Sequence, residues 1–215
     1  YVWLTKQFTS PINVAIPSGN FGNAYSAWFG RSNGLPVNKI LCSTNVNDVL
    51  RRFIETGELA PEKTLPSIAP SMDIQIPSSL ERLIFDFTDG ASAFYDALLK
   101  EDKAKLSDEK IMQLNHIFSS STFLDDDIKS EIKSLYEEFG SIFDPHSVTS
   151  IRMALNNQDS VPTVAVATAS PEKFSNVIAP LIETSSEVVI DDKEEYLKLE
   201  NDKSAISESI KAYFT

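Results

Sequence analysis

The sequence predicts an α/β fold in which a parallel sheet is flanked by helices. Short runs of apolar and β-branched residues occur at 13–16, 39–43 and 161–167, and amphipathic helical patterns fill much of the remainder. The first two runs are separated by one short helical segment, which is typical of a parallel βαβ unit. The 215 residues are 42% hydrophobic and 23% charged, a composition that excludes a disordered polymer or a coiled coil.

The first predicted strand leads into a glycine loop and then into a helix. Residues 13–16 have the sequence Asn-Val-Ala-Ile and stop at Pro17, and residues 18–23 form a tight polar loop, Ser-Gly-Asn-Phe-Gly-Asn. Aromatic residues at helical spacing predict a helix over 24–31, which ends near Asn33-Gly34. The second predicted strand, 39–43, follows directly.

Helices dominate the chain beyond the second strand. Asn45 or Asn47 is predicted to cap a helix over 48–56, which stops at Gly57. A loop over 64–77 contains three prolines. Further helices are predicted at 78–87, 91–99, 108–118, 125–139 and 146–155, then the strand 161–167, a helix from Pro171 to about 181 capped by Ser170, and a last helix at 204–214.

Charge and cysteine content exclude several classes of partner. The net charge is −12, so the chain should repel the phosphates of nucleic acids and anionic membrane surfaces. Cys42 is the single cysteine, which rules out an internal disulfide and fits a reducing compartment, the cytoplasm. His116 and His146 lie far apart and give no metal-ligand spacing, so no metal site is expected. Both histidines are expected to be structural, His146 by capping or packing.

The glycine loop is the strongest local indication of a binding site. Backbone N–H groups converge where a strand feeds a glycine loop onto a helix N-terminus, and the helix dipole favours an anion there. The loop contains no basic residue, so the expected donors are peptide groups together with Ser18, Asn20 and Asn23. This pattern suits a phosphate monoester, whereas the Walker and dinucleotide-binding patterns do not match. An ordinary βα turn remains the alternative on these residues alone.

Five ordered segments resemble the threonine synthase family of pyridoxal 5′-phosphate (PLP) enzymes of fold type II, the tryptophan synthase β-like fold. Residues 16–23, Ile-Pro-Ser-Gly-Asn-Phe-Gly-Asn, resemble the family's PLP phosphate loop. The other four segments are 43–48, 71–83 with its Ser-Met-Asp-Ile start, the Asp-Pro-His-Ser of 144–147, and 167–174. Two positions depart from the family pattern, since Ser170 stands where a histidine is usual and Glu172 replaces a small residue.

The resemblance implies a cofactor, a reaction and the residues that carry them. Threonine synthase converts O-phospho-L-homoserine and water to L-threonine and phosphate in amino-acid biosynthesis. The loop would hold the PLP phosphate, and Thr168 would hydrogen-bond the pyridine nitrogen. The expected cofactor-binding residues are Gly19, Asn20, Phe21, Gly22, Asn23 and Thr168.

The resemblance also implies that part of the active site lies outside this chain. The family's Schiff-base lysine belongs to an N-terminal segment that matches nothing here, so the sequence resembles the C-terminal part of the enzyme, whose N-terminal half is an expected partner. The chain is not expected to be active alone. Three regions are expected: the phosphate-loop region 10–60, a helical insertion at about 78–140, and a late strand with helices over 145–215.

Two other functions remain open at this point. The chain could be a non-catalytic family member that binds a phosphorylated small molecule, an alternative motivated by the missing lysine. It could also be another fold-type II PLP lyase, such as a threonine dehydratase, although the segments at 71–74 and 144–147 argue against that assignment.

Overall fold

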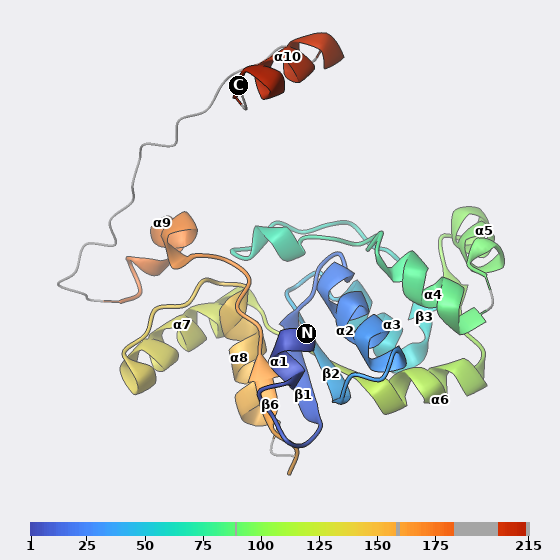
Figure 1. Cartoon of the computed structure of the whole chain (residues 1–215), viewed down its shortest axis with the longest axis horizontal. Coiled ribbons are helices and arrows are strands. Elements are labelled where there is room, and N and C mark those ends of the chain that lie inside the picture. The colour runs from blue at the N-terminus through green and yellow to red at the C-terminus, as the bar shows by residue number, and fades with distance from the viewer. Residues whose placement is uncertain (89, 158–159, 183–201, 214–215) are drawn as a thin grey trace.

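A parallel four-stranded sheet forms the centre of the structure, a computed structural model that describes residues 1–88, 90–157, 160–182 and 202–213 (Figure 1). The strands lie in the order β5-β2-β1-β6. Their bounds are Phe118–Thr122 for β5, Val37–Thr44 for β2, Ile12–Pro17 for β1 and Thr163–Ala165 for β6. The three neighbouring pairs are all parallel, as the sequence predicts for the first two strands and the late one. The carboxyl ends of the strands therefore lie at one edge of the sheet.

Helices connect the strands and cover both faces of the sheet. Their bounds are α1 Val2–Thr5, α2 Gly22–Ser32, α3 Val49–Thr56, α4 Leu80–Thr88, α5 Ser92–Glu101, α6 Asp108–Ile117, α7 Asp125–Phe139, α8 Ser147–Asn156, α9 Ser175–Ile178 and α10 Lys203–Tyr213. Two 3₁₀ turns, η1 at Pro70–Met72 and η2 at Pro171–Phe174, lie in the connections. A second, antiparallel pair joins β3, Glu58–Leu59, to β4, Ala104–Lys105.

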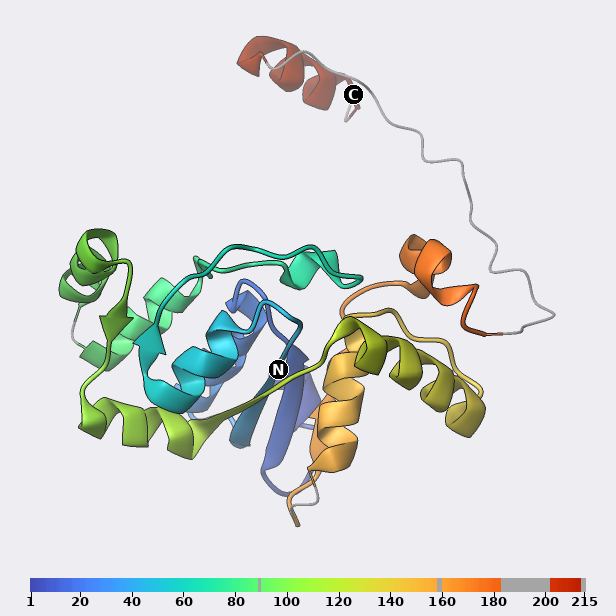
Figure 2. The same cartoon turned by 180° about the vertical axis from the view of Figure 1, so that it is seen from behind.

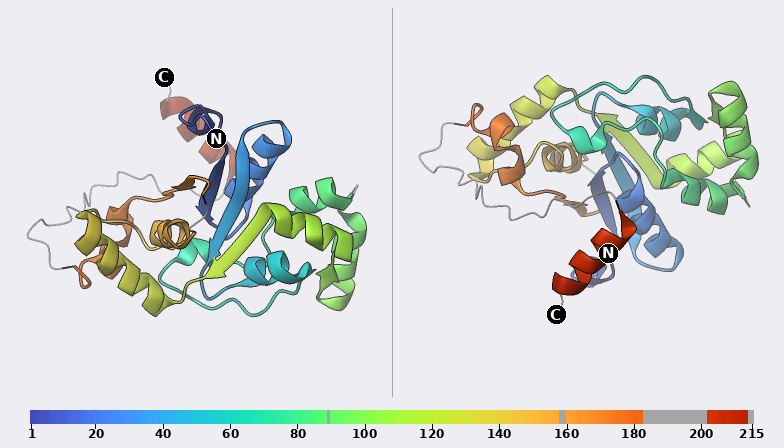
Figure 3. Two further views of the ribbon diagram at one scale, coloured as in Figure 1. Left: turned by 90° about the horizontal axis from the view of Figure 1, so that it is seen from below. Right: turned by 90° about the horizontal axis from the view of Figure 1, so that it is seen from above.

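Alternate side chains of β1 pack into two separate hydrophobic cores, one on each face of the sheet. Val14 and Ile16 of β1 point into a core that also contains buried residues of α2, α3 and α4. Ala15, between them, belongs to the opposite core with residues of α7 and α8. The views from behind and along the sheet show these two helical layers on either side of the strands (Figures 2 and 3). Both faces of the sheet are buried, which is why the strands are continuous apolar runs.

Three of the described strands are not predicted by the sequence, namely the two-residue β3 and β4 and the longer β5. No strand is expected between residues 78 and 140, yet β5 pairs with β2 from Phe118 to Thr122. Phe118 is buried, but the four residues after it are serines and threonine that are only half-buried. An edge strand with a polar sequence lacks the apolar pattern on which strand prediction depends. The predicted helix over 171–181 also differs, because it divides into η2 and the short α9.

Several features bear on partners of the chain. Within the ranges described, no helix has an apolar stretch long enough for a bilayer crossing. No group of His, Cys, Asp and Glu side chains in those ranges is arranged to hold a metal ion. His116 is exposed on α6, whereas the buried residue of that helix is Leu114. His116 is expected from the sequence to be structural, but because its side chain is exposed it does not pack in the core.

Candidate functional site

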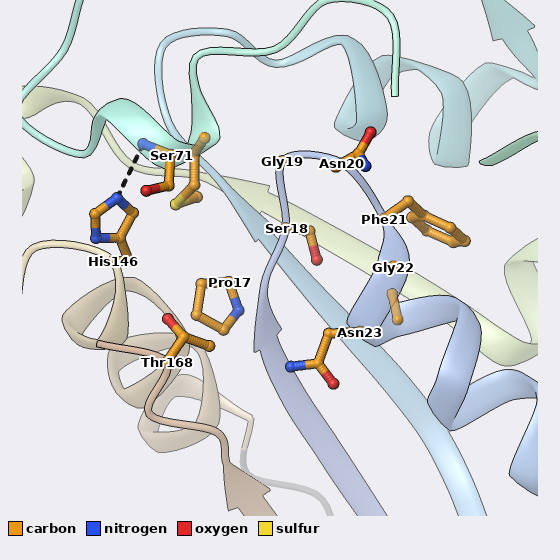
Figure 4. Close-up of a pocket in the computed structure, with 12 residues that line it drawn as sticks. Pro17, Ser18, Gly19, Asn20, Phe21, Gly22, Asn23, Ser71, His146 and Thr168 are labelled. Atoms are coloured by element: carbon orange, nitrogen blue, oxygen red, sulfur yellow. Dashed lines mark hydrogen bonds between the residues drawn. The ribbon is translucent and has the colours of Figure 1, made fainter. Parts of the chain in front are cut away.

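A pocket lies at the edge of the sheet where the strands end. Its wall is formed by the loop after β1, by η1, by the start of α8 and by the segment after β6 (Figure 4). The cavity has a volume of about 220 Å³. All six residues predicted from the sequence to bind a cofactor line it: Gly19, Asn20, Phe21, Gly22, Asn23 and Thr168. Ser71, Met72 and His146 also line it and were not assigned to a site, although each lies in a segment that resembles the family.

The main-chain amides of the loop have no partners in the described structure. The N–H groups of the six consecutive residues from Gly19 to Ala24 donate to no other group described, whereas the flanking Ser18 N–H donates to the Ser43 carbonyl and the Tyr25 N–H to the Phe21 carbonyl. The last three of the six belong to the first turn of α2, whose N–H groups cannot bond within the helix. An array of free amides at a helix N-terminus is suited to binding an anion.

The polar side chains of the loop are already engaged. Ser18 Oγ donates to the Ile16 carbonyl at 3.1 Å, and Asn23 Oδ1 accepts a short hydrogen bond from the Tyr1 hydroxyl. Asn20 Oδ1 accepts from the Ser78 N–H at 2.7 Å. The Ser18 hydroxyl hydrogen is therefore directed to the strand, and the oxygens of both asparagines are occupied as acceptors. The peptide groups remain as donors, together with Asn23 Nδ2, for which the described structure gives no hydrogen bond.

A segment that we call the strap, residues 65–79, covers the loop at close range. A Cβ on Gly19 would lie 2.7 Å from the Ser71 carbonyl oxygen and 2.9 Å from Met72 Cα, both backbone atoms. Real Cβ atoms do not approach other atoms so closely, so this position accepts only glycine while the strap stays in place. A Cβ on Gly22 would lie no closer to the strap than 3.4 Å, from Ser79 Oγ, which is an ordinary contact.

A polar network holds the strap to the end of β2. Asp73 Oδ1 accepts from Asn45 Nδ2 at 2.6 Å and from Asn47 Nδ2 at 3.0 Å. Ser67 joins it through its N–H and its hydroxyl, both donated to Asp73. The sequence predicts that Asn45 or Asn47 caps α3, and this is wrong: the N-cap is Asp48, without a side-chain capping bond. The two asparagines instead hold the strap.

His146 connects the strap to α8. The Ser71 N–H donates to His146 Nε2 at 3.2 Å (Figure 4). On the other side of the ring, His146 Nδ1 lies 2.8 Å from Asp144 Oδ1. The expectation of a packing role is met by a ring contact with Phe174, at 4.9 Å between centroids. The capping role falls instead to Asp144, which accepts from the His146 N–H at 2.9 Å. Burial disfavours the Asp144 carboxylate, but hydrogen bonds from His146 and Ser147 outweigh it and hold the pKa of Asp144 below its ordinary value.

Thr168 faces the loop from the other side of the pocket, beyond Pro17 (Figure 4). Its backbone N–H donates to Ser147 Oγ at 3.0 Å, and its side chain is exposed. No lysine or arginine is among the described residues that line the pocket. Cys42 lies beneath this edge of the sheet, and burial raises the pKa of its thiol to about 12, so it is not a nucleophile at neutral pH.

The turn into α2 depends on an unusual backbone conformation. Phe21 is the N-cap of α2 and has φ of 69°, in the left-handed region that non-glycine residues rarely adopt. Its side chain is buried, with its ring 5.6 Å from that of Phe118. The loop conformation is therefore fixed from the core side by packing.

The close contact of the strap predicts opposite effects for two glycine substitutions. Gly19→Ala should lower the free energy of unfolding by about 1–3 kcal/mol, because the new methyl group meets backbone atoms. Gly22→Ala, which meets only an ordinary contact, should leave it unchanged or raise it by up to about 1 kcal/mol. Urea unfolding of both variants tests this. Equal effects would mean that the strap does not rest on Gly19.

The lowered pKa of Asp144 predicts an acid dependence of stability. A carboxyl whose pKa is lower in the folded state stabilises the fold above the unfolded pKa, and this contribution is lost as the pH falls through the folded value. As the pH falls below about 4, the free energy of unfolding should therefore fall more steeply for the wild type than for Asp144→Asn. Urea unfolding at stepped pH measures the slopes, and Asp126→Asn, at an exposed position, controls for losing one carboxyl. Parallel slopes for the wild type and Asp144→Asn would contradict the prediction.

Known proteins with similar sequences are threonine synthases. The chain is 31% identical to the threonine synthase of Pseudomonas aeruginosa over 173 residues, which are 78% of this chain and 37% of that protein. It is 31% identical to that of Methylobacillus glycogenes over 190 residues, 83% of this chain and 40% of that protein. The chain thus spans less than half the length of these relatives. No protein-family model matches the sequence.

Solved structures give the same result for the fold. A PLP-bound threonine synthase from Brucella melitensis superposes with a TM-score of 0.81 at 25% identity, over 94% of this chain and 46% of that one. Yeast threonine synthase has the same fold, with a TM-score of 0.76 over 93% of this chain and 43% of that one. The family resemblance of the sequence is thereby confirmed. In sequence and in fold, the chain belongs to the threonine synthase family of fold-type II PLP enzymes.

Proposed function

We propose that this chain provides the cofactor-phosphate side of a threonine synthase active site, in which O-phospho-L-homoserine and water become L-threonine and phosphate. One observation carries the proposal: six unpartnered main-chain amides, Gly19 to Ala24, line the same pocket as Thr168. Free amides are the donors that a phosphate group requires. The residues present therefore fit the phosphate of PLP.

The chain's own groups would bind and orient the cofactor. The loop amides, assisted by the dipole of α2, would hold the phosphate without a basic side chain. Thr168 would hold the pyridine nitrogen by a hydroxyl, which is a neutral partner and does not keep that nitrogen charged as a carboxylate would. PLP, when bound, supplies the electron sink for the carbanion chemistry of the reaction.

We further propose that the catalytic lysine comes from outside these 215 residues. The described lining of the pocket contains no lysine that could act as the Schiff-base amine. The cavity, about 220 Å³, is also smaller than the roughly 300–1,000 Å³ of a typical ligand site. Both observations fit a site completed by other residues of a longer enzyme, consistent with the 37–40% of the relatives' length that this chain spans.

Cofactor binding can be tested with a probe that forms no imine. Pyridoxine 5′-phosphate lacks the aldehyde of PLP, so it does not label surface lysines. Isothermal titration calorimetry should give tighter binding of pyridoxine 5′-phosphate than of pyridoxine, with inorganic phosphate as a competitor. Equal affinities for the two would overturn the assignment of the loop.

Two substitutions test the contacts with the phosphate and with the pyridine nitrogen of the ligand separately. Gly22→Asp places a negative charge among the loop amides and should weaken pyridoxine 5′-phosphate binding by about tenfold or more, with little effect on pyridoxine. Thr168→Val removes a hydroxyl worth about 1 kcal/mol and should weaken binding of both compounds about fivefold. Thr64→Val, on an exposed residue of the proline loop, is the matched control. A Gly22→Asp variant that binds as the wild type does would refute the phosphate site.

A turnover assay tests the proposed origin of the lysine. The 215-residue chain, supplied with PLP and O-phospho-L-homoserine, should release no phosphate above the protein-free blank, because no lysine of the described residues lines the pocket. Borohydride reduction followed by peptide mapping should find no single lysine modified preferentially. Phosphate release, or one dominant adduct, would show that the chain carries its own catalytic amine.

A further inference from the structure

Asp144 is a fully buried carboxylate whose hydrogen bonds all come from the start of α8. Its side chain has no exposed surface. Oδ1 accepts from the backbone N–H of His146 at 2.9 Å and lies 2.8 Å from the ring Nδ1 of that residue, and Oδ2 accepts from the Ser147 hydroxyl. No lysine or arginine in the described ranges pairs with it. A buried charge without a cation depends on such hydrogen bonds.

The first connection runs through His146 to the strap. The Ser71 N–H donates to Nε2 at 3.2 Å, so this nitrogen must carry a lone pair. The ring proton then lies on Nδ1 and is donated to Asp144. The carboxylate thus selects the tautomer that can accept from Ser71, and this bond holds η1 at the wall of the pocket.

The second connection runs through Ser147 to Thr168. A serine hydroxyl has one hydrogen and two lone pairs. Ser147 donates its hydrogen to Asp144 Oδ2, which leaves a lone pair to accept from the Thr168 N–H at 3.0 Å. The carboxylate therefore also fixes the orientation of the hydroxyl that holds the Thr168 backbone.

We propose that Asp144 is a positioning residue that sets two parts of the pocket wall at once, Ser71 through His146 and Thr168 through Ser147. It does not line the cavity, whereas His146 and Thr168 do. The proposal deepens the proposed function, since it rests on that function for the identity of the ligand. The positioning itself can be measured without a ligand.

Asp144 also accepts backbone N–H groups at the start of α8, and a purely structural capping role must be separated from positioning. Serine is a good residue for such caps but is too short to reach both the imidazole and the Ser147 hydroxyl. Asp144→Ser therefore keeps the kind of acceptor that the helix start needs and removes both side-chain connections. His146→Phe removes the first connection alone, and Ser147→Ala removes the second alone.

Amide hydrogen exchange in the ligand-free, ¹⁵N-labelled chain reads the two connections separately. His146→Phe should accelerate exchange at Ser71 only, and Ser147→Ala at Thr168 only. Asp144→Ser should accelerate both by about tenfold, the equivalent of about 1.4 kcal/mol. The Asn157 amide, which donates to the Met153 carbonyl at the other end of α8, is the internal reference and should be unchanged.

The results have distinct meanings. Unchanged exchange at Ser71 and Thr168 in Asp144→Ser, or acceleration that extends to Asn157, would overturn the proposal in favour of a capping role. Long-range ¹H–¹⁵N spectra should show the Nδ1–H tautomer of His146 in the wild type, and the Nε2–H tautomer would also overturn it. If Asp144→Ser does not fold, His146→Phe still tests the connection to Ser71, and Ser147→Ala still tests the connection to Thr168.

Binding of pyridoxine 5′-phosphate then links positioning to function. Asp144→Ser should weaken it by about tenfold, whereas Asp126→Asn at an exposed site should not change it. Wild-type affinity in Asp144→Ser would overturn the proposal. A wild-type chain that binds no pyridoxine 5′-phosphate would refute the proposed function instead, while the exchange measurements would still decide the role of Asp144.

Discussion

The free amides from Gly19 to Ala24 are the constraint around which this edge of the sheet is built. None of them has a partner among the described residues, and all six residues line the pocket, where a ligand or water can reach the loop. The surrounding segments are arranged so that the amides stay free: the loop's polar side chains are bonded elsewhere, and the strap meets the loop at Gly19 without pairing with these amides. The pocket is thus kept open by interactions outside it.

Several residues of the segments that resemble the family serve here to hold the backbone in place. Asn45, Asn47 and Asp73 belong to segments that resemble the family, yet their side chains hold the strap and do not line the pocket. Asn20 lines it but directs its carbonyl to Ser78. In the proposed site, specificity for an anion would reside in main-chain geometry, and particular side chains would be needed to maintain that geometry.

The sequence predicts the parts of this structure that depend on local pattern. The β1 and β2 strands and the loop between β1 and α2 follow from apolar β-branched runs, Pro17 and two glycines, and the resemblance brought Thr168 to the same site. The edge strand β5 could not be predicted, since four polar residues follow Phe118 and the strand depends on tertiary contacts, namely pairing with β2 and packing of Phe118 in the core. The contact of His146 with Ser71 spans 75 positions, and no local rule indicates it.

Phe21 combines a strained backbone conformation with a buried aromatic side chain. Its left-handed backbone costs about 1–2 kcal/mol, and glycine or asparagine would relieve that strain. Its buried ring, in contact with Phe118, is worth about 3–5 kcal/mol relative to a small residue, and either replacement would leave a void. The larger energy decides the identity of the residue. The shape of the proposed anion-binding turn is therefore maintained by an aromatic pair in the hydrophobic interior. A substitution at Phe118, remote from solvent, can thus alter the shape of that turn.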